Sequence, residues 1–95
     1  MRHFKQSQFI IVWYCKDNKN LDCMHTTGNL ENAIDTAIRG LYRDYDVCKN
    51  RFPNDLMNNT TNYAIVSDSL NRSKYCQNVS IDGARNITII KNKTI

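Results

Sequence analysis

The first long hydrophobic segment of the chain, residues 9–15, is apolar at every position. Its residues are β-branched, aromatic or cysteine, and it ends at the polar run 16–20. A continuous apolar run bounded by a polar turn is typical of a strand that is buried on both faces. Residues 21–26 have the length of a short return strand, so this part of the sequence predicts a hairpin.

An amphipathic helix is the clearest element that the sequence predicts. Apolar residues recur at spacings of three and four along residues 30–52 and leave a polar opposite face. Asn29 is a natural N-cap, and Pro53 ends the element because the residue before a proline is disfavoured in the α region. We predict a helix over residues 29–50, in which Gly40 needs only a helical backbone. The side chains expected to be buried, with Trp13 or its strand neighbours beneath them, are Ile34, Ile38 and Leu41.

The remainder of the chain predicts a loop and three strands. Residues 51–62 are mostly polar and without periodicity, which is typical of a loop. Residues 63–67 and 74–81 predict two strands, the second of them half-exposed. Asp82-Gly83 is the strongest hairpin signal, because a type I′ turn needs the left-handed φ that this pair adopts easily. We therefore expect a positive φ at Gly83 and a final strand at 86–90.

These elements predict the fold class. The order is β-β-α-β-β-β, which indicates a small single α+β domain over residues 1–95, an antiparallel sheet with one helix packed across one face. A chain of 95 residues buries about two-thirds of the surface that its unfolded form exposes, so one modest core is expected.

Composition and charge exclude several classes of protein. The hydrophobic share of 41% and the charged share of 23% are those of an ordinary globular protein, not of a disordered chain or a fibre. No apolar stretch approaches the roughly 18 residues of a membrane-spanning helix, so we expect no membrane partner. The net charge of +4 is mild, and its positive residues are scattered.

The cysteines and asparagines bear on the compartment. Four cysteines allow three disulfide pairings, and Cys15 and Cys23 could face each other across the first hairpin. Six Asn-x-Ser/Thr sequons exceed random expectation and leave a secreted, glycosylated domain with two disulfides as an alternative. However, the apolar run 9–15 is short, contains two large aromatics and lacks a small-residue cleavage site. We expect a cytoplasmic protein with reduced thiols.

No motif in the sequence predicts catalysis. Cys23 and His25 are two residues apart, but nothing else supports a nucleophile pair, and the cysteines lack zinc-site spacing. Asp44 and Asp46 are two apart on the predicted helix and so lie on different faces, which disfavours a metal-dependent nuclease. We expect no enzyme activity, no cofactor and no metal site.

The sequence predicts more apolar surface than one helix can cover. In a strand, alternate residues point to opposite faces of the sheet, and in the segments 9–15 and 63–66 both sets of alternate residues are apolar. A single helix covers one face of a sheet, so the loop 51–62, a second copy of the chain, a partner protein or stacked bases must cover the other. Exposed apolar patches commonly mark interaction surfaces.

We therefore expect a non-enzymatic protein that binds a host protein or complex through this sheet face. Because its 13 asparagines and 10 isoleucines resemble the composition of many small phage proteins, we expect a viral accessory factor that inhibits or redirects a host protein. Which parity of the first strand faces outward is left open. The predicted partner-binding residues are Trp13, Tyr14, Tyr63, Lys74, Tyr75 and Arg85.

The alternative is a module that binds single-stranded nucleic acid. Aromatics on an open sheet with a basic rim are typical of base-stacking platforms, although the chain lacks the aromatic-glycine signature of RNA modules. Besides the residues above, this interpretation assigns phosphate contacts to Lys16, Arg39, Arg43 and Lys91. A homodimer is a further possibility.

Overall fold

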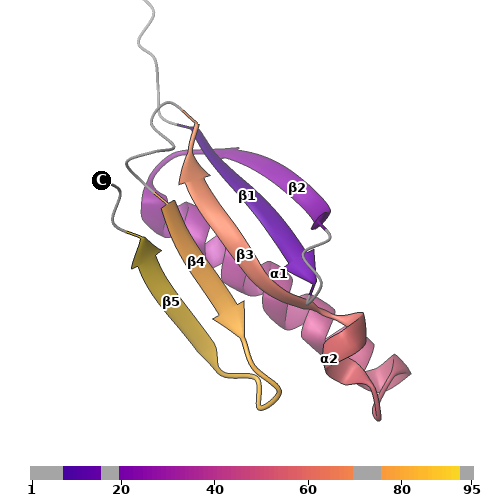
Figure 1. Cartoon of the computed structure of the whole chain (residues 1–95). Coiled ribbons are helices and arrows are strands. Elements are labelled where there is room, and N and C mark those ends of the chain that lie inside the picture. Colours follow the sequence, from indigo (N-terminus) through magenta and orange to yellow (C-terminus); the bar gives the residue numbers. More distant parts are fainter. Residues whose placement is uncertain (1–7, 16–19, 70–75, 93–95) are drawn as a thin grey trace, which may run out of the picture.

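The computed structural model describes residues 8–15, 20–69 and 76–92, which form five strands and two helices (Figure 1). The hairpin of β1 (Gln8–Cys15) and β2 (Asn20–Thr27) precedes the long helix α1 (Leu30–Arg51). A single-turn helix, α2 (Leu56–Asn59), leads into the three remaining strands. These strands are β3 (Thr61–Asp68), β4 (Cys76–Ile81) and β5 (Ile87–Asn92).

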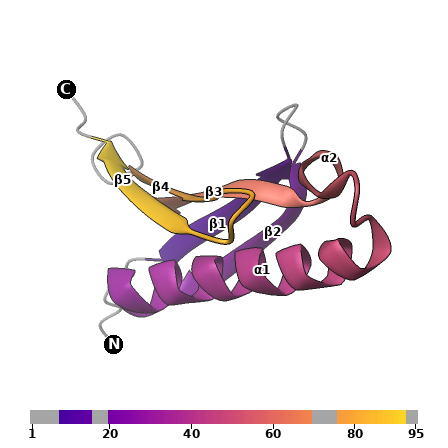
Figure 2. The same ribbon diagram turned by 90° about the horizontal axis from the view of Figure 1, so that it is seen from below.

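The five strands form one antiparallel sheet in the order β2-β1-β3-β4-β5. The two strands that the sequence predicts as buried, β1 and β3, are neighbours in its centre. The helix α1 lies across one face, packed mainly against β1, β3 and β4 (Figure 2). This arrangement confirms the predicted α+β fold and its element order.

The register of the sheet divides the strand residues between its two faces. Phe9, Ile11 and Trp13 of β1 are buried beneath the helix, and the next residue in each case points the other way. Trp13 pairs with Ala64, and Ala64 pairs with Val79, so these residues share the helix side. The pairing also places Val12 opposite Cys23, so the expected facing of Cys15 and Cys23 is wrong.

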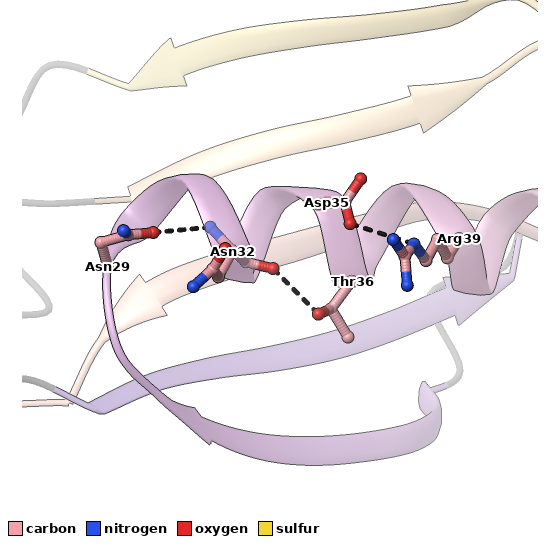
Figure 3. Close-up of polar contacts among 5 residues, drawn as sticks. All are labelled: Asn29, Asn32, Asp35, Thr36 and Arg39. Atoms are coloured by element: carbon pink, nitrogen blue, oxygen red, sulfur yellow. Dashed lines mark hydrogen bonds and ion pairs between the residues drawn. The ribbon is translucent and has the colours of Figure 1, made fainter.

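Helix α1 begins with the predicted cap. The side chain of Asn29 accepts a hydrogen bond from the backbone N–H of Asn32 at 2.8 Å (Figure 3). Glu31 lies in the first turn and Lys49 in the last, where each charge is favourable to the helix dipole. The helix ends at Arg51, one residue later than predicted.

The helix face that meets the sheet is lined with smaller residues than we predicted. Leu41 is buried as expected, but Ile34 and Ile38 are only half-buried and pack at the side of the core. Small residues on the central line let the helix backbone approach the sheet closely, so the larger isoleucines flank the contact. The buried stripe of α1 consists of Ala33, Ala37, Leu41, Tyr45 and Cys48.

Gly40 lies where the helix crosses Trp13. A Cβ added at Gly40 would be 2.6 Å from the indole Nε1 of Trp13, closer than two atoms can approach without displacement. The same Nε1 donates a hydrogen bond to the carbonyl of Ala37 at 3.1 Å. The expectation that Gly40 needs only a helical backbone is therefore wrong, because this site has no room for a side chain.

The β4–β5 hairpin also differs from the prediction. Gly83 does not have a positive φ; instead Arg85 does, at 66°. The N–H of Arg85 donates to the carbonyl of Asp82, and the N–H of Asp82 donates to the carbonyl of Asn86. This is a type I turn followed by one left-handed residue, the common three-residue hairpin loop, and not a type I′ turn.

The segment 51–62 contains α2 and is not wholly a loop. Leu56 and Met57 are partly buried and pack against the core, and the amide of Asn62 donates to the carbonyl of Met57. Since Leu56 and Met57 pack against the core between α1 and the sheet, this segment does not cover the opposite sheet face.

Candidate functional site

The face of the sheet opposite α1, here called the outer face, is the candidate site. No described helix or strand lies across it, since α1 is on the other face and α2 lies beyond the end of the sheet (Figure 2). By the strand register, its central residues are Ile10, Val12 and Tyr14 of β1 and Tyr63 and Ile65 of β3. All five side chains are half-buried.

Tyr14 and Tyr63 form a stacked pair on this face. They are directly opposed in the β1–β3 ladder, and their ring centroids are 5.0 Å apart with an interplanar angle of 8°. Burial raises the pKa of Tyr63 above its usual value, and the neighbouring Tyr14 and Cys15 raise it further. The pair is thus an aromatic surface held by two central strands.

The outer face is apolar over β1 and β3 and polar over β4. Val12 lies opposite Ile65 and Ile10 opposite Ser67, whereas Asn78 and Ser80 continue the face on β4. The Oδ1 atom of Asn78 is buried and accepts no hydrogen bond in the structure. An apolar strip with a polar border is the usual composition of a protein interface.

Not all of the predicted aromatic residues lie on this face. Trp13 is 5% exposed and lies under the helix, so the prediction that it forms part of the contact surface is wrong. Because β1 is apolar on both parities, only the tertiary structure decides which of Trp13 and Tyr14 faces outward. Tyr75, Lys74 and Lys16 lie outside the described residues.

Arg85 connects the β4–β5 hairpin to α1. Its guanidinium donates to both carboxylate oxygens of Asp46, at 3.0 and 2.9 Å, and lies 4.1 Å from the centre of the Tyr42 ring. Arg85 thereby lowers the pKa of Asp46, and Asp46 raises the pKa of Arg85. The hydroxyl of Tyr45 also donates to the carbonyl of Gly83 at 2.7 Å. We call these contacts the hairpin latch.

The basic residues of the nucleic-acid interpretation are separated from the tyrosine pair. Arg39 is exposed on α1 and forms an ion pair with Asp35 at 3.0 Å (Figure 3), and Arg43 is exposed one turn further on. Lys91 pairs with Gln77 and so belongs to the helix side of β5. The structure therefore does not bring Arg39, Arg43 and Lys91 together with the stacked rings.

The carboxylate of Asp44 on α1 has structural partners. It accepts hydrogen bonds from the hydroxyl of Thr60 and from the backbone N–H of Thr61, directly after α2.

The buried thiol of Cys48 donates to the carbonyl of Asn59 at 3.0 Å, and burial raises the pKa of this thiol. Cys48 is consequently a protonated core thiol and a poor nucleophile at neutral pH.

The described residues contain no group of three or more His, Cys, Asp or Glu side chains arranged to hold a metal ion. Within the same ranges, no helix combines the length and apolarity that crossing a membrane requires.

Sequence reasoning missed the hairpin latch. For the turn itself, the sequence held one indication at Asp82, because an aspartate at the start of a turn commonly accepts hydrogen bonds from backbone N–H groups. Its carboxylate does so from Ala84 and Asn86, which lowers its pKa. Nothing in the sequence indicated that an arginine would take the left-handed position and reach back to α1.

Comparison of the chain with protein-family models, with curated proteins and with solved structures finds no match.

Proposed function

We propose that the chain is a non-enzymatic binding protein whose outer face binds an apolar surface of a partner protein. The observation that carries this proposal is the stacked pair Tyr14–Tyr63, which lies on the two central strands, at one end of a sheet face that no described element covers. Tyrosines in a rigid sheet lose little conformational entropy on binding, and large aromatics contribute most to known interfaces. Ile10, Val12 and Ile65 enlarge the same apolar surface.

The wider biological role rests on composition. An asparagine- and isoleucine-rich chain of this size suits a viral accessory factor that inhibits or redirects a host protein in the cytoplasm. The buried thiol of Cys48 accords with a reducing compartment. We therefore propose that the partner bound by the chain is a host protein.

Binding of single-stranded nucleic acid is the second candidate, and the stacked tyrosines also support it. The charges do not favour it. Arg85 is held by Asp46 and Arg39 by Asp35, and Arg39 and Arg43 lie on the helix, across the sheet from the rings. A partner protein is therefore better supported than single-stranded nucleic acid as the ligand of the outer face.

The test compares two double variants of the full chain. The substitutions Tyr14→Ala and Tyr63→Ala together remove the aromatic pair, whereas Arg39→Glu and Arg43→Glu together alter only the exposed helix side. The wild type is used to capture its partner from the native host, and the purified partner is titrated against each folded variant. We expect the tyrosine variant to bind about 30-fold or more weakly, and the arginine variant to match the wild type.

Two outcomes would contradict the proposal. Loss of partner binding in the arginine variant, with full binding by the tyrosine variant, would assign the contact to α1. Salt-dependent retention of a single-stranded oligonucleotide that the tyrosine variant loses, with no protein partner, would assign the outer face to nucleic acid.

A further inference from the structure

The strand β5 is an edge of the sheet that the structure leaves open among its described residues. It pairs with β4 on one side and is last in the strand order. The N–H of Asp82 donates to the carbonyl of Asn86, which fixes the alternation of the ladder beyond the turn. In an antiparallel pair, successive residues direct their backbone groups to opposite sides. Those of Thr88 and Ile90 point to β4, and those of Ile87, Ile89 and Lys91 point away from the sheet.

This edge exposes isoleucine on both of its faces. Ile89 is 44% exposed although it pairs with the fully buried Val79 on the helix side, and Ile90 is 53% exposed on the outer face. Helix α1 packs mainly beneath β1, β3 and β4, and the C-terminal end of β5 rises away from it (Figure 2). The helix therefore leaves the apolar side chain of Ile89 open to a neighbour placed alongside β5.

Most of the usual protections of an edge strand are missing from β5. Proline, inward-pointing charge and β-bulges commonly prevent edges from pairing with another chain. The residues of β5 include no proline, and its ladder with β4 has no register shift. Its one charged residue, Lys91 on the helix side, is the one protection of this kind that the strand carries. At the opposite edge, the β1–β2 ladder has a register shift after Trp13. The sheet thus has one irregular edge and one regular edge.

We propose that β5 pairs with β5 of a second copy of the chain, antiparallel and centred on Ile89. A two-fold axis perpendicular to the sheet keeps each face on its own side, so only residues of the same face can be opposed. The register centred on Ile89 places each outward-pointing residue opposite another one, Ile87 against Lys91 of the second copy and Ile89 against itself.

The side chains fit this register. On the helix side the two Ile89 side chains become neighbours and cover each other, and on the outer face Ile90 lies beside Thr88 of the second copy. Lys91 faces Ile87, so like charges are not directly opposed, and its long aliphatic stem packs on an apolar neighbour. The result is one continuous sheet across two copies. This proposal goes beyond the proposed function and does not depend on the tyrosine pair.

Charged substitutions of Ile89, which lies at the proposed two-fold axis, test both the interface and its register. The mass of the full chain is measured by analytical ultracentrifugation, and wild type should sediment at twice the 11.1 kDa of one chain. Ile89→Lys and Ile89→Glu should each be monomeric, because each places like charges directly opposite. An equimolar mixture of the two should recover the dimer, because lysine then faces glutamate. Ile90→Lys is the matched control and should remain dimeric, since its lysine faces Thr88.

A measurement on the wild type alone covers the case in which a variant fails to fold. The amides of Ile87, Ile89 and Lys91 should be protected from hydrogen exchange to the same degree as those of Thr88 and Ile90. A wild type of single-chain mass with these outward amides exchanging freely would overturn the proposal. So would folded Ile89 variants that dimerise separately, or a mixture of them that stays monomeric.

Discussion

The indole of Trp13 and the backbone of Gly40 are in direct contact where α1 crosses β1. A Cβ at position 40 would be 2.6 Å from Nε1 and 2.7 Å from two ring carbons. The indole cannot easily move away, because Trp13 is 5% exposed and its Nε1 donates to the carbonyl of Ala37. This contact limits how closely the helix can approach the sheet, and it lies on the buried face of β1, opposite the face that carries Tyr14.

The substitution Gly40→Ala should destabilise the protein. In an exposed helix interior this change stabilises by about 1 kcal/mol, but overpacking a close contact costs about 1–3 kcal/mol. We expect a net loss of up to about 2 kcal/mol in the free energy of unfolding, measured by urea denaturation. Gly83→Ala is the control and should be close to neutral, since its Cβ would meet only Met57 Cγ at 3.9 Å. An increase in stability with Gly40→Ala would contradict the contact.

The cost of the alanine should depend on the indole. Trp13→Phe loses the hydrogen bond to Ala37 and removes the atoms nearest to the added Cβ. The double-mutant cycle of Trp13→Phe and Gly40→Ala should therefore show a coupling energy of about 0.5–3 kcal/mol, with the alanine better tolerated beside Phe. Additive effects would mean that the two residues do not meet as the structure shows.

The elements of this fold were predictable because their signals are local. The period of α1, the cap at Asn29 and the apolar runs of β1 and β3 each depend on neighbouring residues. The outward face of β1 was not predictable, because both parities are apolar and the choice depends on how Trp13 fits against Gly40. On the helix, the small residues Ala33, Ala37 and Gly40 allow this close fit. Their role is visible only in the structure, where they lie against the sheet.

The candidate site could be predicted only in part. The sequence indicated an uncovered apolar face and included Tyr14 and Tyr63, but the stacking of these two residues depends on the β1–β3 register. The role of Arg85 depends on a turn type that local preference did not favour, because Asp82-Gly83 is a type I′ signal. Contacts between distant segments decided both outcomes.

Acid should weaken the β4–β5 hairpin through Asp82. Its carboxylate accepts from the N–H groups of Ala84 and Asn86, which lowers the folded-state pKa below the usual value of 3.8. A lowered folded pKa contributes stability that is complete above the unfolded pKa and is lost as pH falls through the folded value.

The check on this dependence is the urea midpoint of wild type and of Asp82→Asn, from neutral pH to below 3.8. The variant keeps an acceptor oxygen without the charge, so it should be less stable at neutral pH and should lose less on acidification. The two proteins should converge in acid. Parallel curves over the whole range would show that Asp82 has no such role.

The stability of a variant at position 85 should depend on whether the new residue can adopt a left-handed backbone conformation. Its φ of 66° is accessible to asparagine but unfavourable for a β-branched residue. Arg85→Asn and Arg85→Val both lose the contacts to Asp46 and Tyr42, so a comparison of the two isolates the backbone effect. We expect a lower melting temperature for the valine variant by differential scanning calorimetry. Equal melting temperatures would indicate that position 85 is not left-handed in solution.

The most direct test of binding through the outer face is site-specific photo-crosslinking in the native host. A benzophenone amino acid replaces Ile65 on the outer face in one chain and Arg43 on the exposed side of α1 in another. We predict a discrete protein adduct from position 65, lost when Tyr14→Ala is added, and none from position 43. An adduct from position 43 with none from position 65 would contradict the account.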